Sequence, residues 1–536
     1  KRSTFQRILA MIACLAIFCA CLAGCSSNKS NSGETANAAT TETSNGSAET
    51  AATESTGGYK ETVTVALPED ITNLDVQESN ATMNLVIQQC IHDPLIKLSA
   101  DGQSFECKVA ESYEQTSDTT WQFNIRKGIK FHNGNELTAD DVLFTFERAI
   151  NSGAANDKVA MITAVNKIDD YTVEIVLEDQ ISDILYYIAY PTLGILNKAA
   201  VEADEANGYT IGCGPYVFDS WSNGDNITMH AFEDYYGGVK PTKNLNFRIM
   251  PEASSRVIAL QTGEVDVCID PPAIELSHIA EDSNLSLLQV SSERMHYLAF
   301  NMSGEPFGSN QKLRQAIAMA INKDNIITVA CEGLGTPAVT FFSQGFGYYD
   351  GYDPYPYDVE KAKALLAEAG YPDGLTFTLY YAGSLKELMS QVIQSNLKEI
   401  GVNVNIEELE TAALKSKLKE GDYEACVYAW ANDSAGPDNN VRPLFRTGSS
   451  SNRTHYSDEY IDNLMDEALK ETDSDKRLEM YKEIQTYILD ACPIVPCFYE
   501  TISVGTNAKL QGFQPDTSGL HRSATSSSNI GASYKT

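Results

Sequence analysis

One stretch in the second half of the chain changes its hydrophobic repeat twice, and this constrains the fold more than any other feature. Residues 375–381 carry an apolar or aromatic side chain at every second position, which predicts a strand. Residues 385–400 carry apolar side chains at helical spacing, with Ser384 placed to cap the helix and Gly401 to end it. The strand repeat returns at residues 402–406. A strand, a helix and a strand in this order form a βαβ unit, so we expect an α/β fold with parallel strands and a right-handed crossover.

The next strand marks a candidate ligand-binding edge. A short helix is expected around residues 414–418, and a further strand over residues 423–430 ends at Trp430. In open α/β sheets, ligands bind in the crevice beyond the carboxyl ends of the strands. Trp430 and the loop after it are therefore expected to lie at such a crevice.

Other periodic segments indicate helices in the second half and strands in the first. Residues 313–321 and 359–369 each carry an apolar stripe at helical spacing, whereas residues 121–125 and 171–177 alternate as strands do. From Tyr59 onwards the chain far exceeds the roughly 250–300 residues at which a single core stops growing. At least two lobes are therefore expected.

Two helix starts carry capping residues. Thr138 precedes an apolar helix, and Asp141 follows it three positions later, which is the spacing of a capping box. Asp358 is placed to cap the helix at residues 359–369. These residues are expected to serve folding.

The first residues of the chain have the layout of an export signal. Lys1, Arg2 and Arg7 precede an apolar run that ends at Leu22-Ala23-Gly24-Cys25. A basic start, an apolar core of about 7–15 residues and small residues at the cut mark a signal peptide. The run is too short to span a bilayer, which takes about 20 residues. We expect a signal peptide over residues 1–24 and a lipidated Cys25; an ordinary secretory signal, in which Cys25 is incidental, is the alternative.

The segment after Cys25 has the composition of a tether. Residues 26–58 contain Ser, Thr, Ala, Gly, Asn and Glu but no aromatic or large aliphatic side chain. Such a segment has nothing to bury and is expected to be disordered. As a flexible coil its ends would lie on the order of 30 Å apart, enough to hold a domain clear of a membrane. The folded part is expected to begin near Tyr59.

The charge and the cysteines exclude some classes of function. A net charge of −34 argues against nucleic-acid binding and favours a solvated acidic exterior. Eight of the 12 cysteines follow Cys25. Their even number permits disulfides outside the cytoplasm, but their apolar surroundings favour buried free thiols. They are Cys90, Cys107, Cys213, Cys268, Cys331, Cys426, Cys492 and Cys497.

Catalytic and metal-binding motifs are not found in the sequence. There is no Gly-x-Ser-x-Gly elbow, no His-Glu-x-x-His pair, no phosphate-binding loop of the Walker type and no EF-hand loop. The seven histidines are dispersed without the spacing of metal ligands. We therefore expect a protein that is not an enzyme and holds no cofactor or metal; a secreted hydrolase is the less favoured alternative.

Several motifs occur in order between Tyr59 and the C-terminus and together resemble a known family. They are Arg126-Lys127-Gly128-Ile129-Lys130-Phe131-His132-Asn133-Gly134 running into Leu137-Thr138-Ala139-Asp140-Asp141-Val142, then Gly212-Cys213-Gly214-Pro215-Tyr216, Leu260-Gln261-Thr262-Gly263-Glu264-Val265-Asp266, Phe300-Asn301, Leu313-Arg314-Gln315-Ala316 and Gly421-Asp422-Tyr423. The chain resembles the extracytoplasmic solute-binding proteins that deliver dipeptides, oligopeptides and nickel complexes to ABC importers. In the second motif Cys213 stands where the family has Thr.

The resemblance implies a type II periplasmic-binding-protein clamp and its partners. Lobe I, large and with an extra subdomain, would span residues 59–300 and be completed by residues 500–536, and the smaller lobe II would span residues 301–499. Ligand binding would shift an open–closed equilibrium. The loaded, monomeric protein would dock on ABC permease subunits while the lipid anchor, palmitate included, holds it at the outer face of the cell membrane. The signature over residues 131–142 is expected to be a folding motif.

The resemblance also implies ligand contacts near Trp430. In the family this tryptophan often lines the cavity; packing in the core is the alternative. Dipeptide binders carry Gly-Asp-Pro in the next loop, where the Asp pairs with the peptide amine, but this chain has Gly436 in place of that Asp. Asp433 or Asp438 could substitute. The candidate contacts are Trp430, Asn432, Asp433, Asp438, Tyr381 and Lys386.

The expected cargo is a peptide or a related small solute. A buried ligand charge without a partner is costly, and neither charge clamp of the dipeptide binders is at its matching position, so a simple dipeptide is disfavoured. A longer peptide held through its backbone, or another solute, stays open. A nickel complex is the alternative, although no histidine lies in the loop after Trp430 and His455 is the nearest along the chain.

Overall fold

A computed structural model describes residues 60–99, 104–238, 242–342, 351–432, 436–510 and 513–516. The expected signal peptide, Cys25, the expected tether and Asp433 lie outside the described residues. Within the described part of the chain, no helix is both long and apolar enough to cross a membrane.

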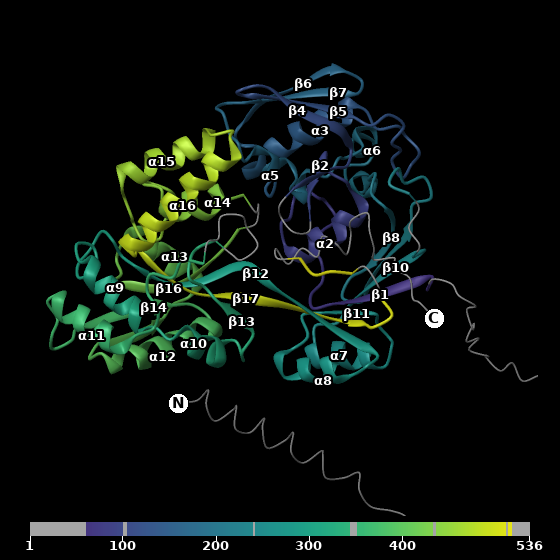
Figure 1. Cartoon of the computed structure of the whole chain (residues 1–536). Coiled ribbons are helices and arrows are strands. Elements are labelled where there is room, and N and C mark those ends of the chain that lie inside the picture. The colour runs from purple at the N-terminus through teal and green to yellow at the C-terminus, as the bar shows by residue number, and fades with distance from the viewer. Residues whose placement is uncertain are drawn as a thin grey trace, which may run out of the picture. The chain divides into compact units, whose positions relative to one another are not determined.

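The main sheet of the fold has 11 strands (Figure 1). Its strands in spatial order are β15 (Asn403–Glu408), β14 (Thr376–Tyr381), β16 (Ala425–Ala431), β12 (Leu285–Phe300), β17 (Ile494–Asn507), β11 (Val267–Ile269), β1 (Thr62–Leu67), β10 (Asn244–Ile249), β9 (Asn226–Ala231) and β8 (Tyr216–Ser222), with β13 (Gly335–Pro337) paired to β17. The two longest strands, β12 and β17, lie in the middle of this order.

Strands β12 and β17 belong to both sides of the sheet. The first part of β12 pairs antiparallel with the last part of β17, from Leu285 with Asn507 to Ser291 with Thr501, on the side of β11 and β1. Beyond a register shift between Ser291 and Met295, β12 pairs with the start of β17 and also with β16. A bulge of this kind bends a strand and increases its twist. We call the side of β1 and β11 the first lobe and the side of β14 to β16 the second lobe.

The predicted βαβ unit is confirmed. Strands β14 and β15 are parallel over their whole length, and α12 (Ser384–Glu399) connects them. Strand β16 also runs parallel to β14. The predicted helix end at Gly401 is confirmed by its positive φ of 85°, but the predicted cap at Ser384 is wrong by one residue. Gly383 adopts a φ of 87°, a conformation that glycine tolerates, so the chain turns there and Ser384 is already helical.

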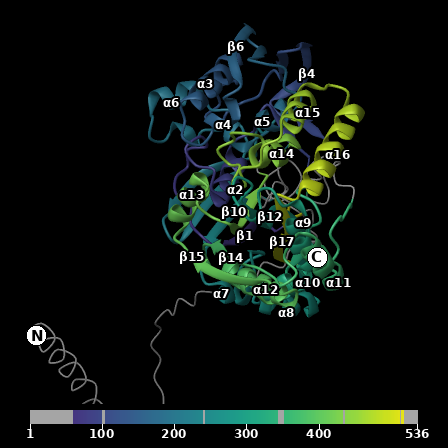
Figure 2. The ribbon, with the colours of Figure 1, turned by 90° about the vertical axis from the view of Figure 1, so that its left-hand side faces the viewer.

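Helices cover both faces of the second lobe (Figures 1 and 2). Leu298 and Phe300 of β12 pack in one core, whereas Met295, Tyr297 and Ala299 pack in another, because successive side chains of a strand point to opposite faces. The first core contains α9 (Gln311–Ala320), α10 (Lys323–Ala330), α11 (Val359–Glu368) and α12. The second contains α13 (Thr411–Glu420), α14 (Asp438–Phe445), α15 (Glu459–Lys470) and α16 (Ser474–Ala491).

The first lobe carries additional sheets and its own cores. A four-stranded antiparallel sheet consists of β4 (Ala110–Ser117), β5 (Thr120–Ile125), β7 (Thr172–Leu177) and β6 (Ile162–Asp169), and β2 (Ile96–Leu98) pairs with β3 (Phe105–Cys107). Its helices are α2 (Thr82–Ile91), α3 (Ala139–Ile150), α4 (Asn156–Val159), α5 (Ile184–Ile188), α6 (Lys198–Ala203), α7 (Ala253–Gln261) and α8 (Leu276–Glu281). Short 3-10 helices cover Pro191–Leu193, Gly208–Thr210 and Ala273–Glu275.

Local sequence signals agree with the observed elements. The capping box at the start of α3 is confirmed, since the Thr138 N–H donates to Asp141 Oδ2 at 3.0 Å. The cap at Asp358 is also confirmed, because its side chain accepts from the Lys361 N–H. All eight cysteines after Cys25 are unpaired in the structure, and six of them are buried. Burial raises the pKa of the buried Cys90 thiol to about 12, in keeping with the expected role of these residues as small hydrophobes.

Candidate functional site

The crevice is expected where β14 and β16 end. Because these two strands are parallel, their carboxyl ends share one edge of the sheet. Trp430 is the next-to-last residue of β16 and lies opposite Met295 of β12, directly after the bulge of that strand. Helix α12 begins just beyond the end of β14. Trp430 therefore lies at the end of β16, beside the bent crossover strand β12, on the sheet edge from which the chain of β14 enters α12.

Hydrogen bonds hold the two ends of the loop after Trp430 together. The Trp430 Nε1–H donates to the carbonyl of Asn439 at 3.0 Å. The Asn439 side chain donates to Asn432 Oδ1 at 2.8 Å, and the Asn432 side chain donates to the carbonyl of Gly436 at 3.0 Å. The Trp430 ring is half-buried against the core of the second lobe, whereas Asn432 is buried. Trp430 is therefore partly exposed, and its indole N–H bonds to the second residue of α14.

Asp438, the first residue of α14, is engaged inside the protein. One carboxylate oxygen accepts from Arg442 Nε at 2.7 Å and the other from the Tyr481 hydroxyl at 3.4 Å. Arg442 also bonds to Asp466 at 2.7 Å. Burial raises the pKa of Asp438 despite the nearby Arg442 guanidinium. Asp438 was expected among the ligand contacts, but the structure gives both of its oxygens partners within the protein.

Tyr381 and Lys386 lie on either side of the turn from β14 to α12. Tyr381 ends β14, and its side chain is buried in the core that contains α9 to α12. Lys386 lies in the first turn of α12 and is half-buried, which lowers the pKa of its ammonium group. The charges of Glu500 and Arg294 act on Lys386. Of the two residues, Lys386 is the one that brings a charge to this end of the sheet.

A group of charged residues on the crossover strands was not found by sequence reasoning. His296 Nε2 of β12 lies 2.6 Å from Glu500 Oε1 of β17, and Arg294 Nε lies 3.8 Å from the other oxygen of Glu500. Burial opposes ionisation of Glu500, but His296, Arg294 and Lys386 outweigh it and lower the pKa of that carboxyl. Arg294 and His296 lie about two hundred positions before Glu500 in the sequence, so no local signal could have joined them.

A second acidic residue near Trp430 was also missed. Asp183, in the first lobe just before α5, is buried, and its Oδ2 accepts from the backbone N–H of Asp438 at 3.1 Å. A side-chain carbon added at Gly436 would lie 3.2 Å from the same oxygen. Only the fold brings Asp183 to this segment, since it lies about 250 residues earlier in the chain.

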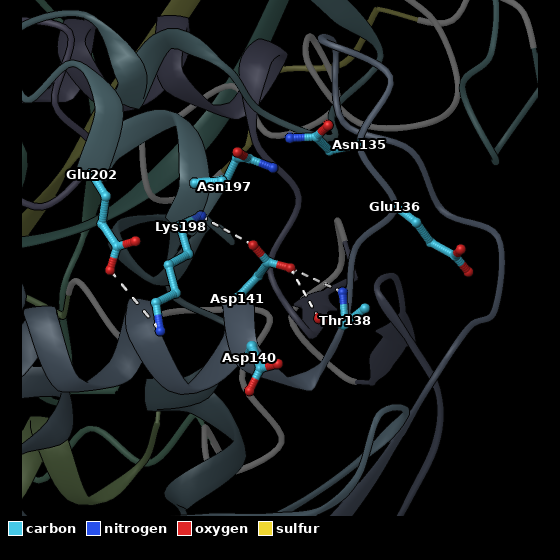
Figure 3. A pocket seen from close by; sticks show the side chains of 9 residues that line it. Asn135, Glu136, Thr138, Asp140, Asp141, Asn197, Lys198 and Glu202 are labelled. Carbon is cyan, nitrogen blue, oxygen red and sulfur yellow. Dashed lines mark hydrogen bonds and ion pairs between the residues drawn. The ribbon is translucent and has the colours of Figure 1, made fainter.

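A hollow of about 380 Å³ on the first lobe involves the signature segment (Figure 3). Asp141 accepts from the backbone N–H of Lys198 at 3.0 Å, and the Lys198 ammonium lies 4.0 Å from Glu202. With the Thr138 cap, these bonds engage both carboxylate oxygens of Asp141. The arrangement fits the expectation that this segment serves folding. Among the residues that the structure describes, no group of three or more His, Cys, Asp or Glu side chains could hold a metal ion.

Comparisons with known proteins match this chain to bacterial solute-binding proteins. The model of the family described as "Bacterial extracellular solute-binding proteins, family 5 Middle" matches residues 105–452. Heme-binding protein A of Haemophilus influenzae is 28% identical over 462 residues, which cover 79% of this chain and 84% of that protein. Glutathione-binding protein GsiB of Escherichia coli is 28% identical over 477 residues, covering 85% and 92%.

Solved structures share the fold. HbpA2 from Haemophilus parasuis superposes with a TM-score of 0.80 at 26% identity, covering 85% of this chain and 98% of that one. The ABC transporter-associated periplasmic binding protein DppA from Helicobacter pylori, in complex with the peptide STSA, superposes with a TM-score of 0.72 at 25% identity, covering 89% and 99%. These similarities confirm the expected two-lobed, type II periplasmic-binding-protein fold. The chain therefore belongs to family 5 of the bacterial extracellular solute-binding proteins and is a substrate-binding protein of an ABC importer.

Proposed function

We propose that this protein captures a peptide or a related small solute beside Trp430 and delivers it to ABC permease subunits. The observation that carries the proposal is the half-buried Trp430, fixed through Asn439 at the shared carboxyl edge of β14 and β16 and next to the bulge of β12. Relatives support a peptide-like cargo, since GsiB is named for glutathione and DppA of Helicobacter pylori was solved with the peptide STSA.

The proposed contacts have distinct roles. The exposed face of the Trp430 ring packs on the solute, and the Lys386 ammonium pairs with an anionic group such as a peptide carboxylate. Asp433 pairs with a cationic group. Asn432 and Asp438 shape the loop and the start of α14 through their bonds inside the protein, and Tyr381 supports the end of β14 from the core. Both charges of a peptide would thereby find partners, which a buried charge requires.

A nickel complex or another non-peptide solute is the alternative. A neighbouring fold is that of NikA from Staphylococcus aureus with Ni(L-His)2, but at 20% identity it bears on the fold alone. The Nε2 atom of His455 lies 2.7 Å from the carbonyl of Leu418, so this histidine is engaged at α13. A peptide is therefore the preferred cargo.

A screen of ligands by thermal shift tests the proposal. A ligand that binds only the folded protein stabilises it by RT ln(1 + [L]/Kd), about 2.7 kcal/mol at a hundredfold excess over Kd. We expect peptide pools to raise the melting temperature and sugars and nickel chelates to leave it unchanged. A shift with nickel chelates alone would favour the alternative. Recovery of the bound peptide unchanged after incubation would separate binding from hydrolysis.

Replacing Trp430 tests the location of the site. Trp430→Ala is expected to weaken binding of the active pool at least tenfold, about 1.4 kcal/mol, because large aromatic side chains dominate binding energies. Isothermal titration measures the affinity, and an unchanged melting temperature without ligand shows that the fold persists. Trp221→Ala in β8, whose indole N–H bonds to Asp70, is the matched control and should keep its affinity. If Trp430→Ala binds the active pool as tightly as Trp221→Ala does, Trp430 serves packing and not ligand binding.

We also propose that Cys25 carries the lipid anchor and that residues 26–58 tether the folded part to the outer face of the cell membrane. A tether of this kind raises the local concentration of the protein at its permease. Cys25→Ala is expected to move the protein from the membrane fraction to the soluble fraction. Cys21→Ala, a cysteine of the apolar run, should stay in the membrane fraction. Membrane retention of the Cys25 variant would contradict the anchor.

The proposed lobes span residues 59–300 with 500–536, and 301–499. Strand β17 changes from the second lobe to the first near Thr501, in keeping with the boundary at residue 500, whereas β12 already changes partners at Ser291 to Met295, ahead of the proposed boundary at residue 300.

A further inference from the structure

The two lobes also meet away from the crossover strands. The segment before α5 in the first lobe contacts the end of α15 in the second lobe, and Figures 1 and 2 both show α5 beside α14 and α15. The backbone N–H of Ser182 donates to the carbonyl of Leu469 at 2.8 Å, and its hydroxyl donates to the carbonyl of Glu471 at 2.6 Å. At the edge of this contact, Asp179 lies 3.9 Å from the Lys470 ammonium.

Asp183 extends the contact to α14. Its Oδ2 accepts from the N–H of Asp438, the first residue of that helix, where the positive end of the helix dipole favours an anion. The segment that starts α14 is the one tied to Trp430 through Asn432 and Asn439. A movement of Asp183 away from α14 would therefore separate the lobes beside the proposed solute site.

The Asp183 carboxyl lies in an environment that disfavours its charge. The residue is 1% exposed, and its Oδ1 has no hydrogen-bond partner among the described residues. Asp438 of α14 adds a like charge, whereas Arg442 of α14 and Arg477 of α16 act in the opposite sense. On its own side, Tyr187 of α5 is neutral, since burial and the two carboxylates raise its pKa. Burial and Asp438 prevail and raise the pKa of Asp183 to about 6.

We propose that the Ser182–Asp183 contact is a latch that holds the two lobes closed, and that uptake of one proton by Asp183 strengthens it. When the lobes separate, water reaches the carboxyl and the buried negative charge no longer carries its desolvation cost. The proton therefore binds more tightly to the closed form than to the open form. By linkage, acid favours closure.

The expected size of the pH effect on closure follows from the protonation equilibria of Asp183 in the open and closed forms. An exposed Asp has a pKa of about 3.9, and Asp183 in the closed form has a pKa of about 6. At pH 7.5 both forms are ionised and the proton has no effect. At pH 5 the closed form is largely protonated and the open form is not, so the closure constant rises about tenfold. Below about pH 4 both forms take up the proton and the gain levels off.

Hydrogen exchange of the ligand-free protein tests the latch. Protection of the Ser182 and Asp438 amides, corrected for intrinsic exchange rates, is expected to be about tenfold higher at pH 5 than at pH 7.5. Asp183→Asn keeps an acceptor for the Asp438 N–H but removes the charge, so its protection should be equal at both pH values. Asp179→Asn, at the exposed edge of the contact, should show the pH response of the unaltered protein. Small-angle scattering should give a smaller radius of gyration at pH 5.

Several results would overturn the proposal. Equal protection at both pH values in the unaltered protein, or a full pH response in Asp183→Asn, would remove the role of the proton. Unchanged protection of the Leu469 to Glu471 region in Ser182→Ala would show that the contact does not hold the lobes. If Asp183→Asn did not fold, the pH series of the unaltered protein and Ser182→Ala would still decide. These measurements use no ligand. The latch can therefore be disproved while the proposed cargo stands, and the proposed cargo can be disproved while the latch stands.

Discussion

Gly212→Ala is expected to prevent stable folding of the first lobe. A Cβ atom at residue 212 would lie 1.9 Å from the carbonyl oxygen of Ile91 and 2.8 Å from His92 Nδ1. Backbone at the end of α2 would have to move, and α2 is buried along almost its whole length. The same glycine also accepts the backbone N–H of His132 at 2.9 Å. Overpacking a rigid interior costs on the order of 3 kcal/mol, and more where backbone atoms clash.

Calorimetric melting and the yield of soluble protein measure this effect. Gly153→Ala is the matched control, since the nearest atom to its new Cβ would be Glu78 Oε2 at 3.7 Å, an ordinary contact. The control should melt within a few degrees of the unaltered protein. Gly212→Ala should begin to unfold at a lower temperature or yield no soluble protein. A Gly212→Ala protein that melts like the control would mean that α2 can move at little cost.

Arg314→Ala is expected to destabilise the second lobe by about 3–5 kcal/mol. Arg314 is 4% exposed. Its Nε and Nη2 donate to the carbonyl of Ala491 at 3.0 and 2.6 Å, and its Nη1 donates to the carbonyls of Phe307 and Gly308. The guanidinium therefore joins the start of α9 to the end of α16. Removal leaves these carbonyls without their donors, and a buried unsatisfied group costs about 1–3 kcal/mol.

Urea denaturation followed by the near-ultraviolet signal tests this prediction. Arg314→Lys keeps a positive charge but lacks the planar fork, so it should recover only part of the stability. Lys312→Ala on the same helix removes an exposed pair with Glu368 at 2.8 Å and should change the stability by less than about 1 kcal/mol. A full rescue by lysine would show that charge, and not the hydrogen bonds to carbonyls, is what the site requires.

These two variants explain parts of the family motifs in physical terms. Gly212 belongs to Gly212-Cys213-Gly214-Pro215-Tyr216, where glycine allows the turn to lie against α2. Arg314 belongs to the motif at the start of α9, where one side chain satisfies the carbonyls of two separate segments. Arg256, four positions before the motif that begins at Leu260, does the same in the first lobe, since it donates to the carbonyls of Met250 and Ile269. The contacts of these residues lie within the scaffold of each lobe.

Local signals predicted the local structure well. The βαβ unit, the helix stripes and the caps at Thr138 and Asp358 were confirmed, because each depends on residues within a few positions of one another. The cap of α12 was wrong by one residue, since a polar side chain at Ser384 indicated a cap that the positive φ of Gly383 supplies one position earlier. Asp438 was predicted as a ligand contact, and its partners Arg442 and Tyr481 became visible only in the fold.

The sequence by itself determined the class of fold, the order of its elements and the edge of the sheet where Trp430 lies, because hydrophobic period and parallel connection follow from neighbouring residues. Only the tertiary structure decided which distant groups meet. The pairing of His296 with Glu500 and of Asp183 with the start of α14 depends on how β12, β17 and the two lobes are arranged in space. The charge environment follows from that arrangement, since burial and neighbouring charges set a pKa and neither is encoded in a short stretch of chain.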